Sequence, residues 1–220
     1  MTARPEPLAI AIEAGTRRVF AAALEWPGWA RSGKTEAGAL ETLLAYAPRY
    51  APIARAAGLE LGQAFEPLIA ERAGPGSGTD FGVVSVPAAA DRRPSSLSQA
   101  ERLAAIVDAA WQEFDRVAAI VPSELRKGPR GGGRDRDAIV AHVNGADAMY
   151  AGVMGLTVRE PARGDRAAVD AIRAAMLEVL RRPSDGSPLA GKKWPARYAA
   201  RRIAWHALDH AWEMQDRSTP

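Results

Sequence analysis

All three histidines of this chain lie in its second half, in segments with helical periodicity. His206 and His210 are four residues apart in WHALDHAW. Since an α-helix rises about 1.5 Å and turns about 100° per residue, side chains at this spacing leave one face about one turn apart. His142 lies in a separate segment, IVAHVNGADAMY, and we expect it to point into the protein interior. The apolar stripe assigned to it contains Ile139, Ala146, Met149 and Val153.

Three imidazoles facing one apolar interior predict a metal site. A buried imidazole without a hydrogen bond destabilises the fold by about 1–3 kcal/mol, and a divalent cation would satisfy all three nitrogens together. Three neutral histidines plus a water are typical of catalytic sites, because one coordination position stays open. The alternative is that each is a core histidine bonded to a carbonyl or carboxylate. We predict His142, His206 and His210 as ligands.

Two carboxylates border the histidine stripe. Asp209 and Glu213 are candidate catalytic residues, as general bases or as groups that orient the ligands, and the alternative is that they are surface carboxylates. Ala207 occupies the position of the glutamate in H-E-x-x-H, so the built-in base of a zinc protease is missing. Arg201 or Arg202 could contact an anionic substrate, or face solvent.

The segment GWARSGKT, residues 28–35, fits the Walker A pattern G-x-x-x-x-G-K-[ST]. A working P-loop also needs a parallel sheet and an acidic residue at the end of another strand to organise Mg²⁺. The flanking sequence has no such strand, and Pro27 favours a turn just before Gly28. We therefore interpret the segment as a Pro-Gly turn followed by a helix entry, with Thr35 as the N-cap.

The pattern of apolar residues along the sequence changes near residue 90. Before it lie short apolar runs broken by Gly and Pro, which predict an α+β unit with a short antiparallel sheet. The predicted strands cover 8–12, 19–24 and 81–86, and the predicted helices cover 36–46 and 53–57. We place domain boundaries at 1–90, 91–96 for a linker and 97–220.

After the linker every long segment has helical period. Ser98 and Glu101 are spaced as a capping box for the first helix, and the loop Gly128–Arg136 follows it. The other three predicted helices cover about 137–154, 165–182 and 196–216. Four amphipathic helices of this length predict an all-α four-helix bundle, a fold that commonly builds metal sites from facing helices.

The helical half resembles the DinB/YfiT-like family of four-helix bundles over about residues 97–217. The resemblance rests on IVAHV and on the ending ARRIAWHALDHAWEMQDR. It implies that His142, His206 and His210 hold a divalent metal, Zn²⁺ first, with Ni, Fe or Mn as alternatives. The family often has a carboxylate one turn after the first histidine, where this chain has Ala146; Asp147 is expected to face elsewhere. Some members resemble transferases or isomerases that use a low-molecular-weight thiol as co-substrate.

The first half resembles the HicB-like small α+β fold over about residues 8–50. Phe20, Pro27-Gly28, Gly33-x-Thr35 and Ala39-Leu40 carry the similarity. In HicB antitoxins this domain binds a toxin and a DNA-binding domain follows, whereas here the predicted bundle takes that place. Two functions stay open. One is a metal-dependent transferase, isomerase or hydrolase acting on a small molecule, and the other is a non-catalytic antitoxin-like or scaffold protein with a structural metal.

The amino-acid composition limits the kinds of site and partner that we expect for this chain. The 220 residues include no cysteine, which excludes disulfides and cysteine-based metal or redox chemistry. A formal net charge of +3 is too small to indicate nucleic-acid binding. No apolar run approaches the roughly 18 residues of a membrane span, and the first residues do not have the pattern of a signal peptide. We expect a cytoplasmic protein without nucleic-acid or membrane partners, with a homodimer as an open alternative.

Overall fold

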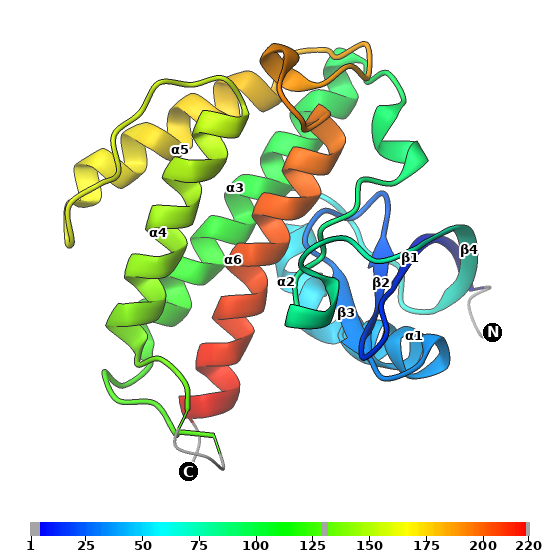
Figure 1. The fold of residues 1–220 in the computed structure, drawn as a ribbon, viewed down its shortest axis with the longest axis horizontal. Helices are drawn as coiled ribbons and strands as arrows, with labels where there is room; N and C mark the ends of the chain where they lie inside the picture. Colours follow the sequence, from blue (N-terminus) through cyan, green and yellow to red (C-terminus); the bar gives the residue numbers. More distant parts are fainter. Residues whose placement is uncertain (1–4, 129–131, 219–220) are drawn as a thin grey trace.

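The chain has a mixed α+β fold (Figure 1), seen in a computed structural model that describes residues 5–128 and 132–218. Over these residues it has four strands and six α-helices. The predicted loop at 128–136 and the outer ends of the two predicted domains fall partly outside the described residues. In Figure 1 the sheet and its helices lie on one side of α6, and α4 and α5 lie on the other.

The N-terminal unit is a four-stranded sheet with the order β3-β2-β1-β4. Leu8, Ile10 and Ile12 alternate along β1 and are buried on the face that also holds Leu43 and Ile53. This alternation is why the segment forms a half-buried strand. The elements of the unit are β1 (Glu6–Ala14), β2 (Val19–Ala23), β3 (Ala30–Gly33), α1 (Glu36–Ala45), α2 (Ala47–Ala56) and β4 (Phe65–Ala73).

The prediction of a wholly antiparallel sheet is wrong. Strands β1, β2 and β3 are antiparallel as expected, but β4 pairs with β1 in parallel. Helices α1 and α2 carry the chain from β3 to the opposite edge, so β4 runs in the same direction as β1. Its sequence, FEPLIAERA, lacks the apolar alternation by which a strand is predicted. It contains charged residues and Pro67, which an edge strand tolerates.

The prediction of a strand at residues 81–86 is also wrong. The chain instead makes a 3₁₀ turn, η1 (Thr79–Phe81), and then an irregular segment. The buried carboxylate of Glu13 accepts hydrogen bonds from the backbone N–H groups of Ser85 and Val86, at 3.0 Å each, and from the Thr79 hydroxyl. Because a side chain takes these donors, no neighbouring strand is needed to satisfy them.

The Walker-like segment is part of the sheet. Gly28 has φ of 91°, and a Cβ there would lie 2.7 Å from Leu208 Cδ1, so the turn requires glycine both for its backbone and for its contact with the last helix. The next residues form β3, paired with β2. Thr35 caps α1 by accepting a hydrogen bond from the Gly38 N–H at 3.1 Å, which confirms the predicted N-cap. A strand paired in this way does not wrap a phosphate.

The described part of the second half contains four α-helices. Helix α3 packs on α6 and α5, and α4 packs on the same two helices. Among the described residues no helix combines the length and apolar character that crossing a bilayer requires. Their bounds are α3 (Leu97–Ile120), α4 (Arg136–Val153), α5 (Arg166–Leu180) and α6 (Ala196–Ser218), with 3₁₀ turns η2 (Ala89–Arg92) and η3 (Leu189–Gly191) in the connections.

The capping box of α3 lies two residues before the predicted one. Ser96, not Ser98, is the N-cap: it accepts from the Gln99 N–H at 3.3 Å, and its own N–H donates to the Gln99 side chain at 3.0 Å. The preceding residue, Ser95, exchanges two backbone hydrogen bonds with Ser184, which holds the chain extended up to the cap. The helix therefore starts at once, and the Ser98–Glu101 spacing has no capping role.

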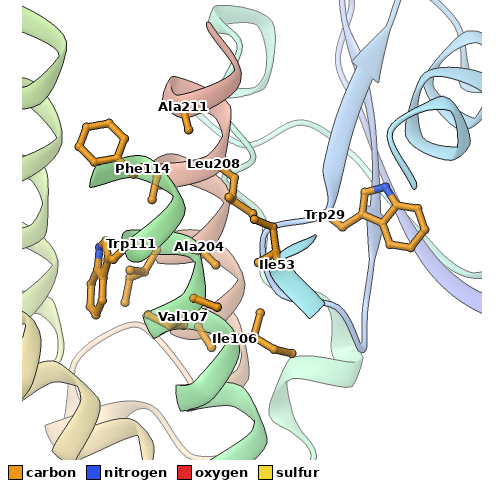
Figure 2. Close-up of a cluster of buried hydrophobic side chains, with 14 of the residues drawn as sticks. Trp29, Ile53, Ile106, Val107, Trp111, Phe114, Ala204, Leu208 and Ala211 are labelled. Carbon is orange, nitrogen blue, oxygen red and sulfur yellow. The ribbon is translucent and has the colours of Figure 1, made fainter. Parts of the chain in front are cut away.

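The two halves share a core. One cluster of buried side chains extends from Trp29 and Ile53 in the N-terminal unit to Ile106 on α3 and Leu208 on α6 (Figure 2). On the other face of the sheet, Trp205 of α6 meets Phe20 edge to face, with ring centroids 6.1 Å apart. Trp212 of the same helix meets Tyr46 of the N-terminal unit, with ring centroids 5.1 Å apart.

The stretch predicted as a linker is packed against α6. Asp91 is 2% exposed and accepts hydrogen bonds from the guanidinium of Arg201, which is 5% exposed, and from the Ala88 N–H at 2.8 Å. A carboxylate and a guanidinium buried together need each other, because either alone would be an uncompensated buried charge. This pair therefore ties the segment between the halves to the last helix.

We expect Asp91→Ala to lower the free energy of unfolding by about 3–5 kcal/mol, because it leaves Arg201 buried without its anion. Urea unfolding followed by circular dichroism measures this. Arg93→Ala is the control, since both side chains of its ion pair with Glu25 are at least half exposed, at 61% and 50%, and its effect should stay within about 1 kcal/mol. Equal effects of the two changes would contradict a buried pair that holds the segment.

Candidate metal centre

The three histidines converge between α4 and α6. His142 comes from α4, and His206 and His210 come from α6; one ring nitrogen from each can be chosen so that all three lie within 4.8 Å of one another. The Nε2 atoms of His142 and His206 are 3.2 Å apart. The three ring centroids are 4.8–5.0 Å from one another. The structure thus brings together the residues that sequence spacing singled out.

Packing of α4 against α6 sets this arrangement. Ile139 and Ala146 are buried one turn before and after His142, which is itself half-buried. Met149, placed on the same stripe from sequence, is 60% exposed, so that part of the prediction is wrong. Ten residues separate Ile139 from Met149, and at about 100° per residue the stripe has drifted roughly 80° around the helix by then.

Glu213 holds His210 in place. Its Oε2 accepts a hydrogen bond from His210 Nδ1 at 2.8 Å, one helical turn along α6. Hydrogen bonding to His210, and further to Arg217, holds the pKa of Glu213 below its usual range. With Nδ1 as the donor, Nε2 is the nitrogen left with a free lone pair. Carboxylate–histidine pairs of this kind commonly orient metal ligands.

The electrostatics keep His206 neutral. Burial lowers its pKa to about 2, and the nearby His210 and Arg202 act in the same direction. The pKa of His142 is also lowered, first by burial and then by His210. Neutral imidazole is the form that binds a metal, so protons do not compete with a cation for His206 near neutral pH.

The carboxylate of Asp209 forms an ion pair outside the histidine cluster. Its carboxylate pairs with Arg31 of β3 at 2.8 Å, across the junction between the sheet and α6. Arg31 also lies over the ring of Tyr46, 4.1 Å from its centroid. Sequence reasoning grouped Asp209 with Glu213, and nothing in the spacing indicates that an arginine from the other half of the chain would pair with it.

Asp147 does not face the histidines. It is 2% exposed and accepts a hydrogen bond from Arg173 of α5 at 3.0 Å. Arg173 also pairs with Asp115 of α3, so the three charges form a network inside the helical half. The position one turn after His142 is Ala146, which offers no ligand atom. Within the described residues the cluster of candidate ligands consists of the three histidines.

The donor set fits a divalent metal. At Zn–N distances of about 2.0–2.1 Å and tetrahedral angles, two ligand nitrogens lie about 3.3 Å apart, close to the 3.2 Å between the Nε2 atoms of His142 and His206. The Nδ1 atom of His206 is buried and has no hydrogen-bond partner among the described residues. Its imidazole therefore depends on its Nε2 side for any polar contact, which is the side where the three rings meet.

Aromatic side chains and a cavity border the cluster. The ring centroid of Tyr150 is 5.7 Å from that of His206, and the ring of Trp194 lies tilted against Tyr150 at 5.0 Å between centroids. A cavity of about 230 Å³ lies between the sheet and α6. Its lining includes Trp205 and Glu213 but none of the histidines. The side chain that orients His210 is thus reached from this cavity.

Comparison of the chain with family models, curated proteins and solved structures gives no match. The geometry of the site is therefore the basis for the functional argument.

We expect Glu213→Ala to weaken metal binding about 10–100-fold, because His210 loses the acceptor that fixes its ring and tautomer. Competition titration against a chromophoric zinc chelator measures this. Asp209→Ala is the matched control on the same helix, since its carboxylate binds Arg31 and should leave the affinity within about threefold. If both variants bind metal like the wild type, Glu213 does not position a ligand.

Proposed function

We propose that this chain is a DinB-like metal-binding protein. In this proposal α3–α6 form a four-helix bundle that holds a divalent cation through His142, His206 and His210, with Zn²⁺ first and Ni, Fe or Mn as alternatives. The N-terminal unit is HicB-like and covers one side of the last bundle helix. The observation that carries the proposal is the convergence of three imidazoles, one of them held by a carboxylate on its outer nitrogen.

We further propose that the centre is catalytic and acts on a small molecule. A three-histidine site leaves a coordination position open, where a bound metal could activate water or a thiol, or polarise a carbonyl. The chain's own residues orient this site: Glu213 holds His210, and the rings of Tyr150 and Trp205 flank His206. Small-molecule chemistry suits a site bordered by aromatic rings and a cavity.

The neighbouring side chains favour one reaction class. Glu213 is shared between His210 and Arg217, and Asp209 is paired with Arg31, so both candidate bases already hold a partner. Ala207 stands where a zinc protease has its glutamate. A thiol bound to a metal would need no such base, because the cation would lower the pKa of the thiol and favour its anionic form. This supports a thiol-dependent transferase or isomerase, with a low-molecular-weight thiol as co-substrate, over a hydrolase.

The second candidate is a non-catalytic protein with a structural metal, antitoxin-like or a scaffold. The core shared between the two halves favours it, because a cation between α4 and α6 would strengthen a helix against which the sheet packs. The two candidates differ in how much of the fold depends on the metal.

Wild-type protein purified without added metal should contain about one divalent ion per chain by plasma mass spectrometry, since three neutral imidazoles make a high-affinity set. His206→Ala should reduce this to below about one tenth. Met149→Ala, an exposed change on α4, is the control and should retain the ion. A wild type free of metal, and unable to take up Zn²⁺ on addition, would refute the centre.

Metal removal separates the two candidates. If the centre is catalytic and the shared core holds the fold, chelator treatment should lower the melting temperature by only a few degrees and Zn²⁺ should restore it. The measurement is thermal unfolding followed by circular dichroism, with His206→Ala as the metal-free reference. Loss of the helical signal at 25 °C on chelation would favour the structural metal instead.

A further inference from the structure

Arg202 borders the histidine cluster. It lies one turn before His206 on α6, so both side chains leave the same side of the helix. The guanidinium lies over the rings of Tyr150 and Trp205, 5.4 and 4.8 Å from their centroids. The same two rings also contact His206, at 5.7 and 6.3 Å between centroids. The guanidinium of Arg202 and the imidazole of His206 therefore contact the same two aromatic rings.

This guanidinium has no anionic partner in the described part of the chain. Its Nη1 is buried and has no hydrogen-bond partner there. Its neighbour Arg201, by contrast, is buried and pairs with Asp91. A buried N–H left unpaired disfavours the folded state, and the imbalance is largest for a charged group. Aromatic faces stabilise the cation but do not satisfy its in-plane donors.

The surroundings of the cluster are positive. The guanidinium of Arg202 lies over the two rings that contact His206, which places a cation near the imidazoles. The carboxylate that acts on His142 is Glu213, and it is already hydrogen-bonded to His210 and Arg217. A divalent cation on the histidines would add to this positive potential. Such a site attracts an anionic ligand and disfavours a neutral or cationic one.

We propose that Arg202 is a substrate-binding residue and that the centre takes a small organic oxyanion, a carboxylate or a phosphate ester. This rests on the proposed function, and it adds the charge and class of the substrate. The planar fork of the guanidinium binds one oxyanion through two N–H groups, a geometry that lysine cannot reproduce. Tyr150 and Trp205 hold the fork beside His206, which the same two rings contact.

The opposing interpretation is that Arg202 is a packing residue whose cation–π contacts fill space between α4 and α6. Both interpretations expect Arg202→Met to change the local packing. Only the substrate-binding role expects a selective loss of affinity for anions. Arg202→Lys separates them further, because it keeps the charge and the apolar stem but loses the two-point contact.

Calorimetric titration of the full-length, zinc-loaded protein tests the proposal. The probes are benzoate, phenyl phosphate and uncharged benzamide. We expect at least one of the two anions to bind, benzamide to bind at least tenfold more weakly, and the preferred anion to show whether carboxylate or phosphate is recognised. Arg202→Met should weaken anion binding at least tenfold and Arg202→Lys several-fold. Lys193→Met, which removes an exposed charge near the start of α6, should stay within twofold.

Metal content and melting temperature are measured on every variant. The proposal is overturned if neither anion binds the wild type, if benzamide binds as tightly as the anions, or if both Arg202 variants bind anions like the wild type. A wild type without metal refutes the proposed function separately. The titration is then run on the metal-free protein, where loss of anion binding in Arg202→Met supports the anion site and unchanged binding overturns it.

Discussion

The structure depends on a single helix that is buried on nearly all sides. Helix α6 packs on α3 and α4 through one set of side chains and on the sheet unit through Trp205, Leu208 and Trp212. A helix that is apolar around most of its circumference belongs in the centre of a protein, not at its surface. The two halves must therefore close around it. The polar residues that are buried with it, such as Arg201 and His206, each need a specific partner.

Those partners distinguish structural charges from functional ones. Arg201 meets Asp91, and Asp209 meets Arg31, so both are used to join the segment between the halves and the sheet to α6. On the side that faces α4, His206 and Arg202 have no carboxylate partner among the described residues, and each has a buried nitrogen without a hydrogen bond there. Arg31, Arg197 and Arg217 also have such a nitrogen, but each of them is ion-paired through another one. The absence of such a pair at His206 and Arg202 points to ligands as the missing partners.

Sequence alone predicted what depends on local pattern. The three histidines at helical spacing, the helices of the second half and the Thr35 cap follow from period and capping chemistry, which are local. Strand β4 and its parallel pairing were missed, because a polar edge strand lacks the alternation that marks a buried one. The partners of Glu13, Asp91 and Asp209 were missed as well. Glu13 is more than sixty residues from Thr79 and Ser85, Asp91 is as remote from Arg201, and Asp209 from Arg31. A lone charge in the sequence does not reveal so distant a partner.

The same constraint bears on the proposed metal centre. Two neutral imidazoles whose Nε2 atoms face each other at 3.2 Å can share one proton, and the third ring has its Nδ1 committed to Glu213. With that proton between His142 and His206, the Nε2 lone pair of His210 faces the pair without a donor of its own. Packing of α6 between two interfaces holds the three rings in this arrangement. A cation between the rings would take lone pairs of all three imidazoles as ligands, so the rigidity imposed by the fold favours the proposed centre.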